Sequence, residues 1–491
     1  MLKSIQLMLD NFEENNIEYC HWKSNEHIED ALRGDTDLDI LFNPAQRTIL
    51  EYTLCKSGLK RFRAMPLMQY NAIEDYIGFD KETAKIWHLH LHYRLSIGEK
   101  HLKGYTVPWT EYILSRRLLV DTTEGKIYCS SADDEFFLIL VRMALKLRWR
   151  DYWKKIGKDD LLEIEWLKEH TSSSSVISVA EKMLNVSCAC EIERLLQKNL
   201  NKKRQLYSLQ KYLRAGMRRF TPYNRFTSWY RRTVRELYWL FGGIKRRMGM
   251  SSTKATRRVS PSGGTVVALL GCDGAGKSTT LAYLKKEFNK KIDVYSVYLG
   301  SGDGSSSLIR KPMKIIAKRV GGKGVGRTME KELYEKKKKS IKARLYALSK
   351  IIWAVTLASE KRKKLKKITM ARNNGLLVLV DRYPQIAVMG FSDGPLLTRY
   401  LNGKGFLKKI SHWEYRIYKH AYENPPDLLV KLMVPTDIAI QRKPEMTVEE
   451  IENKKAAVRK IHTGKAEVEI DTSRDMKQSF GDVMQSIWEV I

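Results

Sequence analysis

Apolar residues in the second half of the chain gather in short runs that are separated by longer amphipathic stretches. The runs at 265–270, 376–380 and 428–434 are largely apolar, and helix-compatible segments lie between them. Runs of this length are typical of strands that are buried on both faces. Because strands that alternate with helices pack into one parallel sheet, the pattern predicts an α/β fold for this half.

The first half shows two different patterns of apolar and polar residues. Up to about residue 130, short helical segments mix with strand-like runs such as 38–42, and 86–95 alternates between apolar and polar residues. From about 132 to 245, apolar residues recur at three- and four-residue spacing, which is typical of helices. We therefore expect an α+β domain that is followed by a helical extension.

A change of composition separates the two halves. Residues 248–264 are rich in Ser, Thr, Gly and basic residues and lack apolar periodicity, which predicts a linker. The 491 residues are also too many for a single core. The predicted organisation is an α+β domain at 1–130, a helical extension at 131–247, the linker at 248–264 and an α/β domain at 265–491.

The strongest motif directly follows the apolar run 265–270. Residues 271–278 read GCDGAGKS and match G-x-x-x-x-G-K-[ST] at every fixed position. Such a loop turns its main-chain N–H groups toward nucleotide phosphates, and the helix N-terminus adds positive potential. Lys277 can then reach the β- and γ-phosphates, and Ser278 can hold Mg²⁺. The residues predicted to bind ATP are Gly271, Asp273, Gly274, Ala275, Gly276, Lys277, Ser278 and Thr279.

A second motif, Asp381 followed by Arg382, comes directly after the apolar run 376–380. Asp381 would lie at the carboxyl end of a parallel strand, where ligands of such sheets bind, and could orient Mg²⁺ or the acceptor. Arg382 could neutralise a phosphate through two hydrogen bonds. The charged stretch 442–465 could form a lid over the transferring group, although a solvated surface helix explains its charges equally well. The candidate catalytic residues are Lys277, Asp381, Arg382, Arg442 and Arg459.

Four segments together resemble thymidylate kinase and its relatives: GCDGAGKST at 271–279, DRYP at 381–384, PPDLLVKL at 425–432 and IDTS at 470–473. The resemblance covers about 265–491 and implies a P-loop nucleoside-monophosphate-kinase fold that uses ATP and Mg²⁺. It further implies that Asp273 meets the acceptor sugar and that Arg382 binds the acceptor phosphate. Ala275 stands where some members carry an arginine, so Arg442 or Arg459 would supply the catalytic arginine from the lid.

Departures from that family leave the acceptor open. The segment between the P-loop helix and Asp381 is long and very basic, and 298–304 replaces the usual acceptor-side pattern. The expected reaction transfers the γ-phosphoryl group of ATP to a nucleoside monophosphate such as dTMP, or to a related phosphate or hydroxyl acceptor. One alternative is a sugar or lipid-linked acceptor of bacterial surface-polysaccharide synthesis. Another is an ATP-gated binding module for nucleic acid or membrane, in which transfer is vestigial.

Two carboxylates mark the first half. Asp37 and Asp39 alternate within a predicted strand, so both face the same side and could bind Mg²⁺ with a triphosphate. Residues 34–41 resemble the nucleotidyltransferase fold, whose signature ends in D-x-D. Where an uncharacterised branch of that superfamily carries a third carboxylate, this chain has His90.

Three interpretations of this domain stay open. It could catalyse a weakened or altered nucleotidyl transfer, or it could have a binding or structural role. A transition-metal site of His88, His90 and His92 is the third, since these side chains share one strand face. Three parallel side chains of one strand are, however, poor tetrahedral geometry.

Charge points to anionic partners. The net charge is +32, which suits ATP, a small anionic acceptor, nucleic acid or an anionic membrane surface. Residues 218–247 interleave aromatic and basic residues, as in a domain-packing helix, a membrane-surface helix or a nucleic-acid-stacking segment. The lysine runs at 336–339 and 361–367 are interpreted first as solvated helix faces and second as an anion funnel near the acceptor.

Cysteine usage and the absence of long apolar runs suggest the compartment. Six cysteines in a chain of this length do not form a disulfide scaffold, and no stretch resembles a signal peptide or a membrane span. We expect reduced thiols and a cytoplasmic protein, with peripheral attachment to the inner membrane face as an option. A homo-oligomer is also expected.

Overall fold

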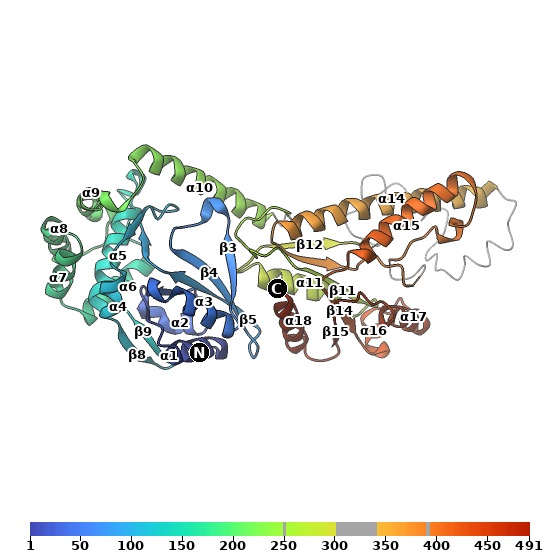
Figure 1. Ribbon diagram of the computed structural model, residues 1–491, viewed down its shortest axis with the longest axis horizontal. Coiled ribbons are helices and arrows are strands. Elements are labelled where there is room, and N and C mark those ends of the chain that lie inside the picture. Colours follow the sequence, from blue (N-terminus) through green and yellow to red (C-terminus); the bar gives the residue numbers. More distant parts are fainter. Residues whose placement is uncertain (249–251, 301–340, 389–392) are drawn as a thin grey trace. The chain divides into compact units, whose positions relative to one another are not determined.

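The computed structural model describes residues 1–248, 252–300, 341–388 and 393–491, and it divides the chain into two compact units (Figure 1). The N-terminal unit comprises 1–250 and 256–261, and the C-terminal unit comprises 251–255 and 262–491. Of the predicted basic helical stretch from about 311 to 367, residues 311–340, including the lysine run 336–339, lie outside the described residues, as does 301–304 of the acceptor-side segment. Within the described residues, no helix combines the length and apolarity needed to cross a bilayer.

An eight-stranded mixed sheet forms the centre of the N-terminal unit, in the order β10-β3-β4-β5-β2-β1-β9-β8. The pairs β2·β5 and β1·β9 are parallel, and the others are antiparallel. The strands are β1 (Tyr19–His21), β2 (Leu38–Phe42), β3 (Lys60–Ala64), β4 (Ile73–Asp80), β5 (Lys85–His92), β8 (Leu118–Thr122), β9 (Gly125–Cys129) and β10 (Arg258–Val259), with a separate hairpin of β6 (Leu95–Ile97) and β7 (Tyr105–Val107).

Ten α-helices of the described part of this unit surround the sheet and extend beyond it. Helix α1 (Lys3–Glu14) precedes the first strand, and the short helices that follow later strands are α2 (Ile28–Leu32), α3 (Arg47–Lys56) and α4 (Thr110–Ser115). A later block contains α5 (Ala132–Lys146), α6 (Lys158–His170), α7 (Ser173–Met183), α8 (Val186–Leu196), α9 (Tyr207–Gly216) and α10 (Arg225–Arg247).

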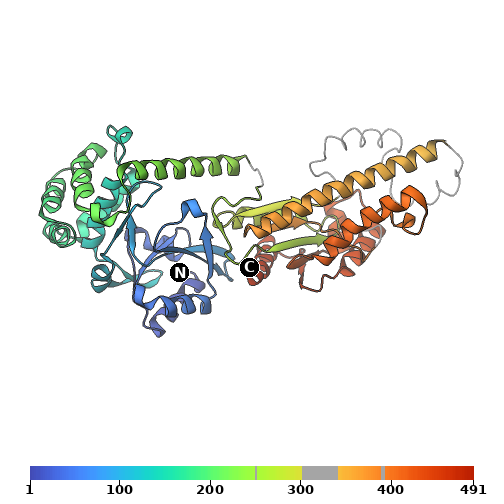
Figure 2. The same cartoon turned by 45° about the horizontal axis from the view of Figure 1, so that its top comes forward.

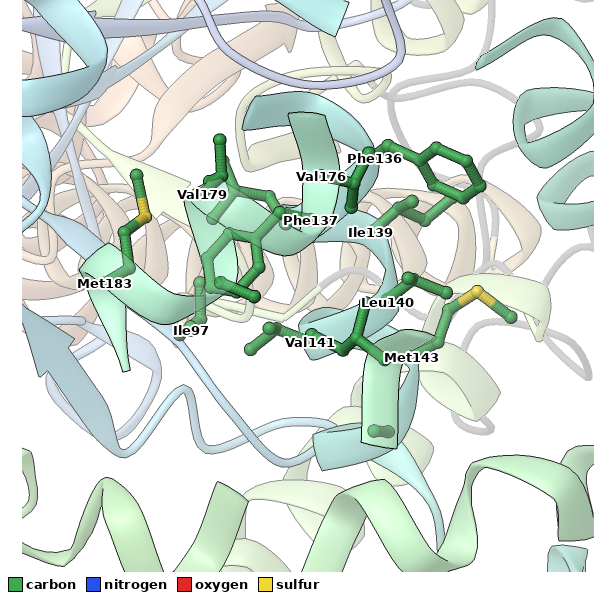
Figure 3. Close-up of a cluster of buried hydrophobic side chains, with 14 of the residues drawn as sticks. Ile97, Phe136, Phe137, Ile139, Leu140, Val141, Met143, Val176, Val179 and Met183 are labelled. Carbon is green, nitrogen blue, oxygen red and sulfur yellow. The ribbon is translucent and has the colours of Figure 1, made fainter. Parts of the chain in front are cut away.

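Helix α5 joins the helical block to the sheet. Its residues are apolar almost all round, and Ser131 caps its start by accepting a hydrogen bond from the N–H of Asp134. Phe137 lies beside Val179 and Met183 of α7 (Figure 3), and the same core reaches Leu41 of the sheet. The predicted α+β domain and its helical extension therefore share this core, and a second core lies within the α+β domain alone.

The segment 248–264 has more structure than its composition predicts. Within it, β10 pairs antiparallel with β3, with Arg258 opposite Ala64 and Val259 opposite Arg63. The pairing satisfies main-chain groups of β3 that an edge strand would leave open. A contact between residues so far apart in the chain has no signal in local composition.

A five-stranded parallel sheet forms the C-terminal unit, in the order β12-β13-β11-β14-β15. Its parallel strands agree with the predicted α/β class. The strands are β11 (Val266–Gly271), β12 (Val294–Tyr298), β13 (Leu377–Asp381), β14 (Leu428–Met433) and β15 (Ala466–Asp471). The described helices are α11 (Lys277–Phe288), α14 (Ile341–Asn373), α15 (Gly405–Glu423), α16 (Thr436–Arg442), α17 (Val448–Arg459) and α18 (Met476–Val490). Helices α14 and α15 run side by side in both views (Figure 2).

Candidate functional site

The P-loop connects β11 to α11 at the carboxyl edge of the parallel sheet. Gly274 and Gly276 have φ angles of 83° and 80°, a left-handed conformation that favours glycine. A Cβ on Gly274 would also lie 2.8 Å from the main-chain oxygen of Ala439 in α16. The glycine spacing of the motif is therefore required both by the backbone turn and by close packing against α16.

Lys277 begins α11 and is 8% exposed. Its Nζ donates hydrogen bonds to the main-chain oxygens of Gly271 (2.9 Å) and Cys272 (2.6 Å). Burial lowers the pKa of Lys277, with a further contribution from the charge of Arg382. The ammonium group therefore lies folded over the loop, where it can turn toward the phosphates of a nucleotide.

Three further P-loop residues differ in their exposure. Ser278 and Thr279 lie in the first turn of α11 with exposed side chains, so the Ser278 hydroxyl is open to a metal ion. Ala275 is fully buried, and its small side chain fits against the end of β11. These positions agree with a loop that presents its main chain and its hydroxyl groups to a ligand.

Asp381 ends β13, where the parallel register places it beside Leu269 of β11 and Tyr298 of β12. Its side chain is buried, and Oδ1 has no hydrogen-bond partner among the described residues. Burial raises the pKa of this carboxyl, while the charges of Lys277 and Arg382 oppose the shift. A carboxylate oxygen without a protein partner, close to the P-loop, suits Mg²⁺ as a ligand.

Arg382 follows with a left-handed backbone, at a φ angle of 64°. A non-glycine residue in this region costs about 1–2 kcal/mol, and such strain often accompanies functional sites. The guanidinium donates from Nη2 to Asp273 Oδ1 at 3.2 Å, and Nη1 lies 3.5 Å from Asp393 Oδ2. The arginine thus lies between the P-loop and the loop before α15.

The charged stretch 442–465 reaches the P-loop through two residues. Arg442 donates to the main-chain oxygens of Gly274 (3.1 Å) and Thr472 (3.0 Å), and Lys454 of α17 pairs with Asp273. Burial alone would raise the pKa of Asp273, but the hydrogen bond and charge of Lys454 outweigh that effect and lower it. Arg459 ends α17 with an exposed side chain, and its described contacts do not include a P-loop residue.

Lys361 lies near Arg382 and is buried. The sequence predicted it first as part of a solvated helix face, but its side chain is only 1% exposed. Its Nζ lies 3.5 Å from Asp393 Oδ1 and 4.7 Å above the ring of Tyr418. The sequence carried a signal, because the buried residues Leu357 and Leu365 lie four positions to either side on the same helical face.

A chain of alternating charges results. It runs from Lys361 through Asp393, Arg382 and Asp273 to Lys454, and so links α14 to α17 across the end of the sheet. An anionic substrate would compete with the carboxylates of Asp273 and Asp393 for the guanidinium of Arg382. The arrangement can therefore couple the binding of an anion to the contacts of α17.

In the N-terminal unit, both predicted carboxylates have histidine partners. Asp37 lies 3.0 Å from His88 Nδ1, and Asp39 Oδ1 lies 2.8 Å from His90 Nδ1. The parallel pairing of β2 with β5 explains this, since it aligns Asp39 with His90. Lys23 Nζ holds the other oxygen of Asp39 at 2.9 Å.

His92 completes a cluster with Asp39 and His90. Its side chain is fully buried, its Nε2 lies 3.4 Å from Asp39 Oδ1, and neither ring nitrogen makes a hydrogen bond to a described residue. Burial lowers the pKa of His92 well below its usual range and that of His90 to about 4. One ligand atom from each of the three residues lies within 4.8 Å of the others, and neutral imidazoles are ready metal ligands.

The predicted three-histidine cluster is not the one that forms. His88 instead bridges Asp37 and Asp75, and Asp75 in turn accepts from Arg258 Nε at 2.8 Å. A hollow of about 690 Å³ lies on the His90 side of the sheet and is lined by arginines from β3 and from the segment around β10. His90 thus faces a cationic cleft.

Comparisons with known proteins give partial matches. The chain is 28% identical to the uncharacterized ATP-binding protein YghS of Escherichia coli K12 over 38% of this chain and 77% of that protein. It is 29% identical to the uncharacterized ATP-binding protein YghR of the same strain over 42% of this chain and 80% of that protein. No family model matches the chain.

Solved structures to which the chain is similar include two kinases. A deoxyadenosine kinase from M. mycoides with bound dCTP is 15% identical, with a TM-score of 0.24, and the match covers 46% of this chain and 99% of that one. A thymidylate kinase from Candida albicans is 14% identical, with a TM-score of 0.28, over 47% of this chain and 91% of that one.

Proposed function

We propose that the C-terminal unit transfers the γ-phosphoryl group of ATP to a small anionic acceptor. The observation that carries this proposal is the convergence of the P-loop, Lys277, Asp381 and Arg382 at one edge of a parallel sheet. The names of YghS and YghR, as ATP-binding proteins, support the choice of nucleotide.

Each residue then has a role in binding or in stabilising the transition state. The main-chain N–H groups of 271–278 would hold the β- and γ-phosphates, and Lys277 would leave its carbonyl partners to neutralise charge on the transferring group. Ser278 and Asp381 are the side chains that would hold Mg²⁺, which would supply positive charge to the phosphates. Arg382 would bind the acceptor's anionic group, and Arg442, near Gly274, would add positive charge from the other side.

The acceptor is proposed by its chemistry. A nucleoside monophosphate such as dTMP is the first candidate, and a sugar or lipid-linked phosphate or hydroxyl is the second. Arg382 and Asp273 lie within a hydrogen bond of each other, so a ligand with both a phosphate and a sugar hydroxyl could engage them together. An ATP-gated binding module without transfer is the competing function.

An acceptor screen tests the proposal. Full-length protein is incubated with Mg²⁺ and ATP plus monophosphates, phosphosugars, lipid-linked sugars or oligonucleotides, and products are identified by mass spectrometry. We expect acceptor-dependent ADP and a product heavier by one phosphoryl group. Lys277→Ala should lower turnover about 100-fold or more, because it removes a preorganised positive charge from the transition state.

Lys286→Ala is the matched control, since Lys286 is an exposed lysine of the same helix. Its turnover should equal that of the wild type. Hydrolysis of ATP that oligonucleotides stimulate without any modified acceptor would favour the binding module. Full turnover by Lys277→Ala would refute the site.

A second function is proposed for the N-terminal unit, namely binding of a divalent transition metal by Asp39, His90 and His92. The specific observation is the buried His92: Nδ1 has no hydrogen-bond partner among the described residues, which costs about 1–3 kcal/mol, and Nε2 makes only the 3.4 Å contact with Asp39 Oδ1. In a tetrahedral zinc site neighbouring ligand atoms are about 3.3–3.5 Å apart. The 3.4 Å from Asp39 Oδ1 to His92 Nε2 matches this spacing, and the 2.8 Å hydrogen bond from Asp39 Oδ1 to His90 Nδ1 would lengthen by about 0.5 Å on metal binding. Imidazole nitrogens favour such metals over Mg²⁺.

Zinc titration of chelator-treated protein tests this second function. We expect one site that a tenfold excess of Mg²⁺ does not displace, and at least about tenfold weaker binding in His92→Gln. His27→Gln, at an exposed histidine of the same unit, is the control and should bind like the wild type. Equal zinc affinity in His92→Gln, or displacement by Mg²⁺, would contradict the assignment.

A further inference from the structure

Helix α10 carries a continuous apolar stripe that faces away from its own unit. The stripe consists of Phe226, Trp229, Tyr230, Leu237, Leu240, Phe241 and Ile244, whose spacing by one, three and seven residues keeps them within a sector of about 120° on a helix. Every one of them is exposed, from 45% at Leu240 to 72% at Phe226. Helix α10 is one long 23-residue helix (Figures 1 and 2), and the positions of the stripe residues follow almost its whole length.

The opposite side of α10 holds the helix to the N-terminal unit. Arg232 Nη1 pairs with Glu99 Oε2 at 2.6 Å, and Arg235 donates to the main-chain oxygens of Leu102 (3.2 Å) and Gln69 (2.8 Å). Trp239, which lies outside the stripe, also packs against His101 of this unit, with ring centroids 5.4 Å apart. The helix therefore packs on its own unit through this side and leaves the stripe residues exposed on the other.

Further aromatic side chains adjoin the stripe. Trp149, in the turn after α5, is 84% exposed and lines the same hollow of about 380 Å³ as Trp229. Exposed tryptophans are costly in water but are enriched where a protein meets the interface of a bilayer. The stripe and Trp149 thus extend one apolar surface beyond the helix.

The positive charge of α10 indicates which kind of partner covers this surface. Helix α10 has seven basic residues and one acidic residue; Arg225 and Arg231 are exposed outside the stripe, and Arg247 is exposed at its edge. A second copy of the same helix would bring like charges together, whereas anionic headgroups would neutralise them. Nucleic acid would satisfy the arginines, but Leu237, Leu240 and Ile244 offer no aromatic ring on which a base could stack.

We propose that α10 lies in the surface of an anionic lipid bilayer, with its apolar stripe inserted among the acyl chains and its arginines at the headgroups. This places the N-terminal unit at a membrane, independently of the reaction that the C-terminal unit catalyses.

Vesicle flotation of the full chain tests the proposal. The probes are phosphatidylcholine vesicles with and without phosphatidylglycerol. We expect the wild type to float with the anionic vesicles, to float less as salt is raised, and to float poorly with neutral vesicles. The variant Leu240→Glu/Phe241→Glu should lose at least about tenfold in partitioning, because it places two charges in the apolar stripe.

The matched control is Leu118→Glu/Leu119→Glu, which changes two exposed leucines of β8 in the same unit. It should float like the wild type. If circular dichroism shows that the stripe variant is unfolded, Phe226→Ser/Trp229→Ser at the other end of the helix repeats the test. Light scattering and oligonucleotide binding are measured in parallel on all proteins.

Four results would overturn the proposal. They are no flotation of the wild type, unchanged flotation of the folded stripe variants, a wild-type dimer that becomes monomeric in those variants while lipid has no effect, and oligonucleotide binding that the variants lose while flotation is kept. The third would assign the stripe to a second copy of the chain, and the fourth to nucleic acid.

Discussion

At the scale of single residues, Gly274 and Gly276 share a left-handed backbone but have different surroundings. A Cβ on Gly274 would collide with the main chain of Ala439, whereas one on Gly276 would meet nothing within 4 Å. Gly276→Ala should therefore cost only the conformational penalty of about 1–2 kcal/mol, and Gly274→Ala should cost more because α16 must move. Melting temperatures of the two variants check this order, and an equal loss would contradict the packing argument.

Glu135 provides a pH-dependent prediction. Burial raises its pKa to about 8, although Asn25 donates to it from the main chain at 2.9 Å and from the side chain at 2.5 Å. Because the folded state holds this proton more tightly than the unfolded state, Glu135 destabilises the fold progressively as pH rises from about 4.5 to about 8. In the Glu135→Gln variant the amide side chain cannot ionise, so its stability does not fall with pH for this reason.

The variant's stability relative to the wild type should thus rise with pH, by on the order of 1 kcal/mol per pH unit within this window. The comparison is made by thermal unfolding between pH 5 and pH 8. Loss of one hydrogen bond from Asn25 shifts the whole curve but leaves its slope unchanged. A relative stability that is flat or falls with pH would contradict the raised pKa.

At the scale of elements, α17 is joined to the P-loop by the Lys454–Asp273 pair, which is about one-third exposed. Lys454→Ala should weaken the docking of α17 by about 1 kcal/mol, because a partly exposed, charge-assisted hydrogen bond is lost. We expect amide hydrogen exchange in α17 to accelerate about fivefold while β11 stays protected. Lys460→Ala, which removes an exposed lysine just beyond the same helix, should leave exchange unchanged.

Elements that depend on local sequence could be predicted, and those that depend on distant contacts could not. Apolar runs in the sequence predicted the strands β11, β13 and β14, and the glycines of 271–278 predicted a tight turn before a helix. The pairing of β10 with β3, nearly two hundred positions apart along the chain, left no local trace. Candidate residues followed the same rule, since Asp381 is set by the end of its strand and the Lys454–Asp273 pair by tertiary packing.

At the scale of the whole molecule, two units with separate cores should unfold separately. Scanning calorimetry should resolve two transitions. Mg²⁺ and ATP at about 100 times the dissociation constant stabilise a binding unit by about 2.7 kcal/mol, which should raise only the C-terminal transition, by roughly 5–10 °C. A single transition, or an equal shift of both, would contradict independent units.

The parallel sheet of the C-terminal unit also decides where this protein can be labelled. The candidate groups of the proposed kinase site lie at or beyond the carboxyl ends of the strands, so the amino ends are remote from them. Gly464, in the turn just before β15, is exposed, and a Cβ built on it would meet nothing within 4 Å; its φ angle of 71° favours keeping glycine there, so a label is better inserted beside it. A fluorophore or an affinity handle attached at that turn could follow the protein in solution without touching its phosphate-binding loop.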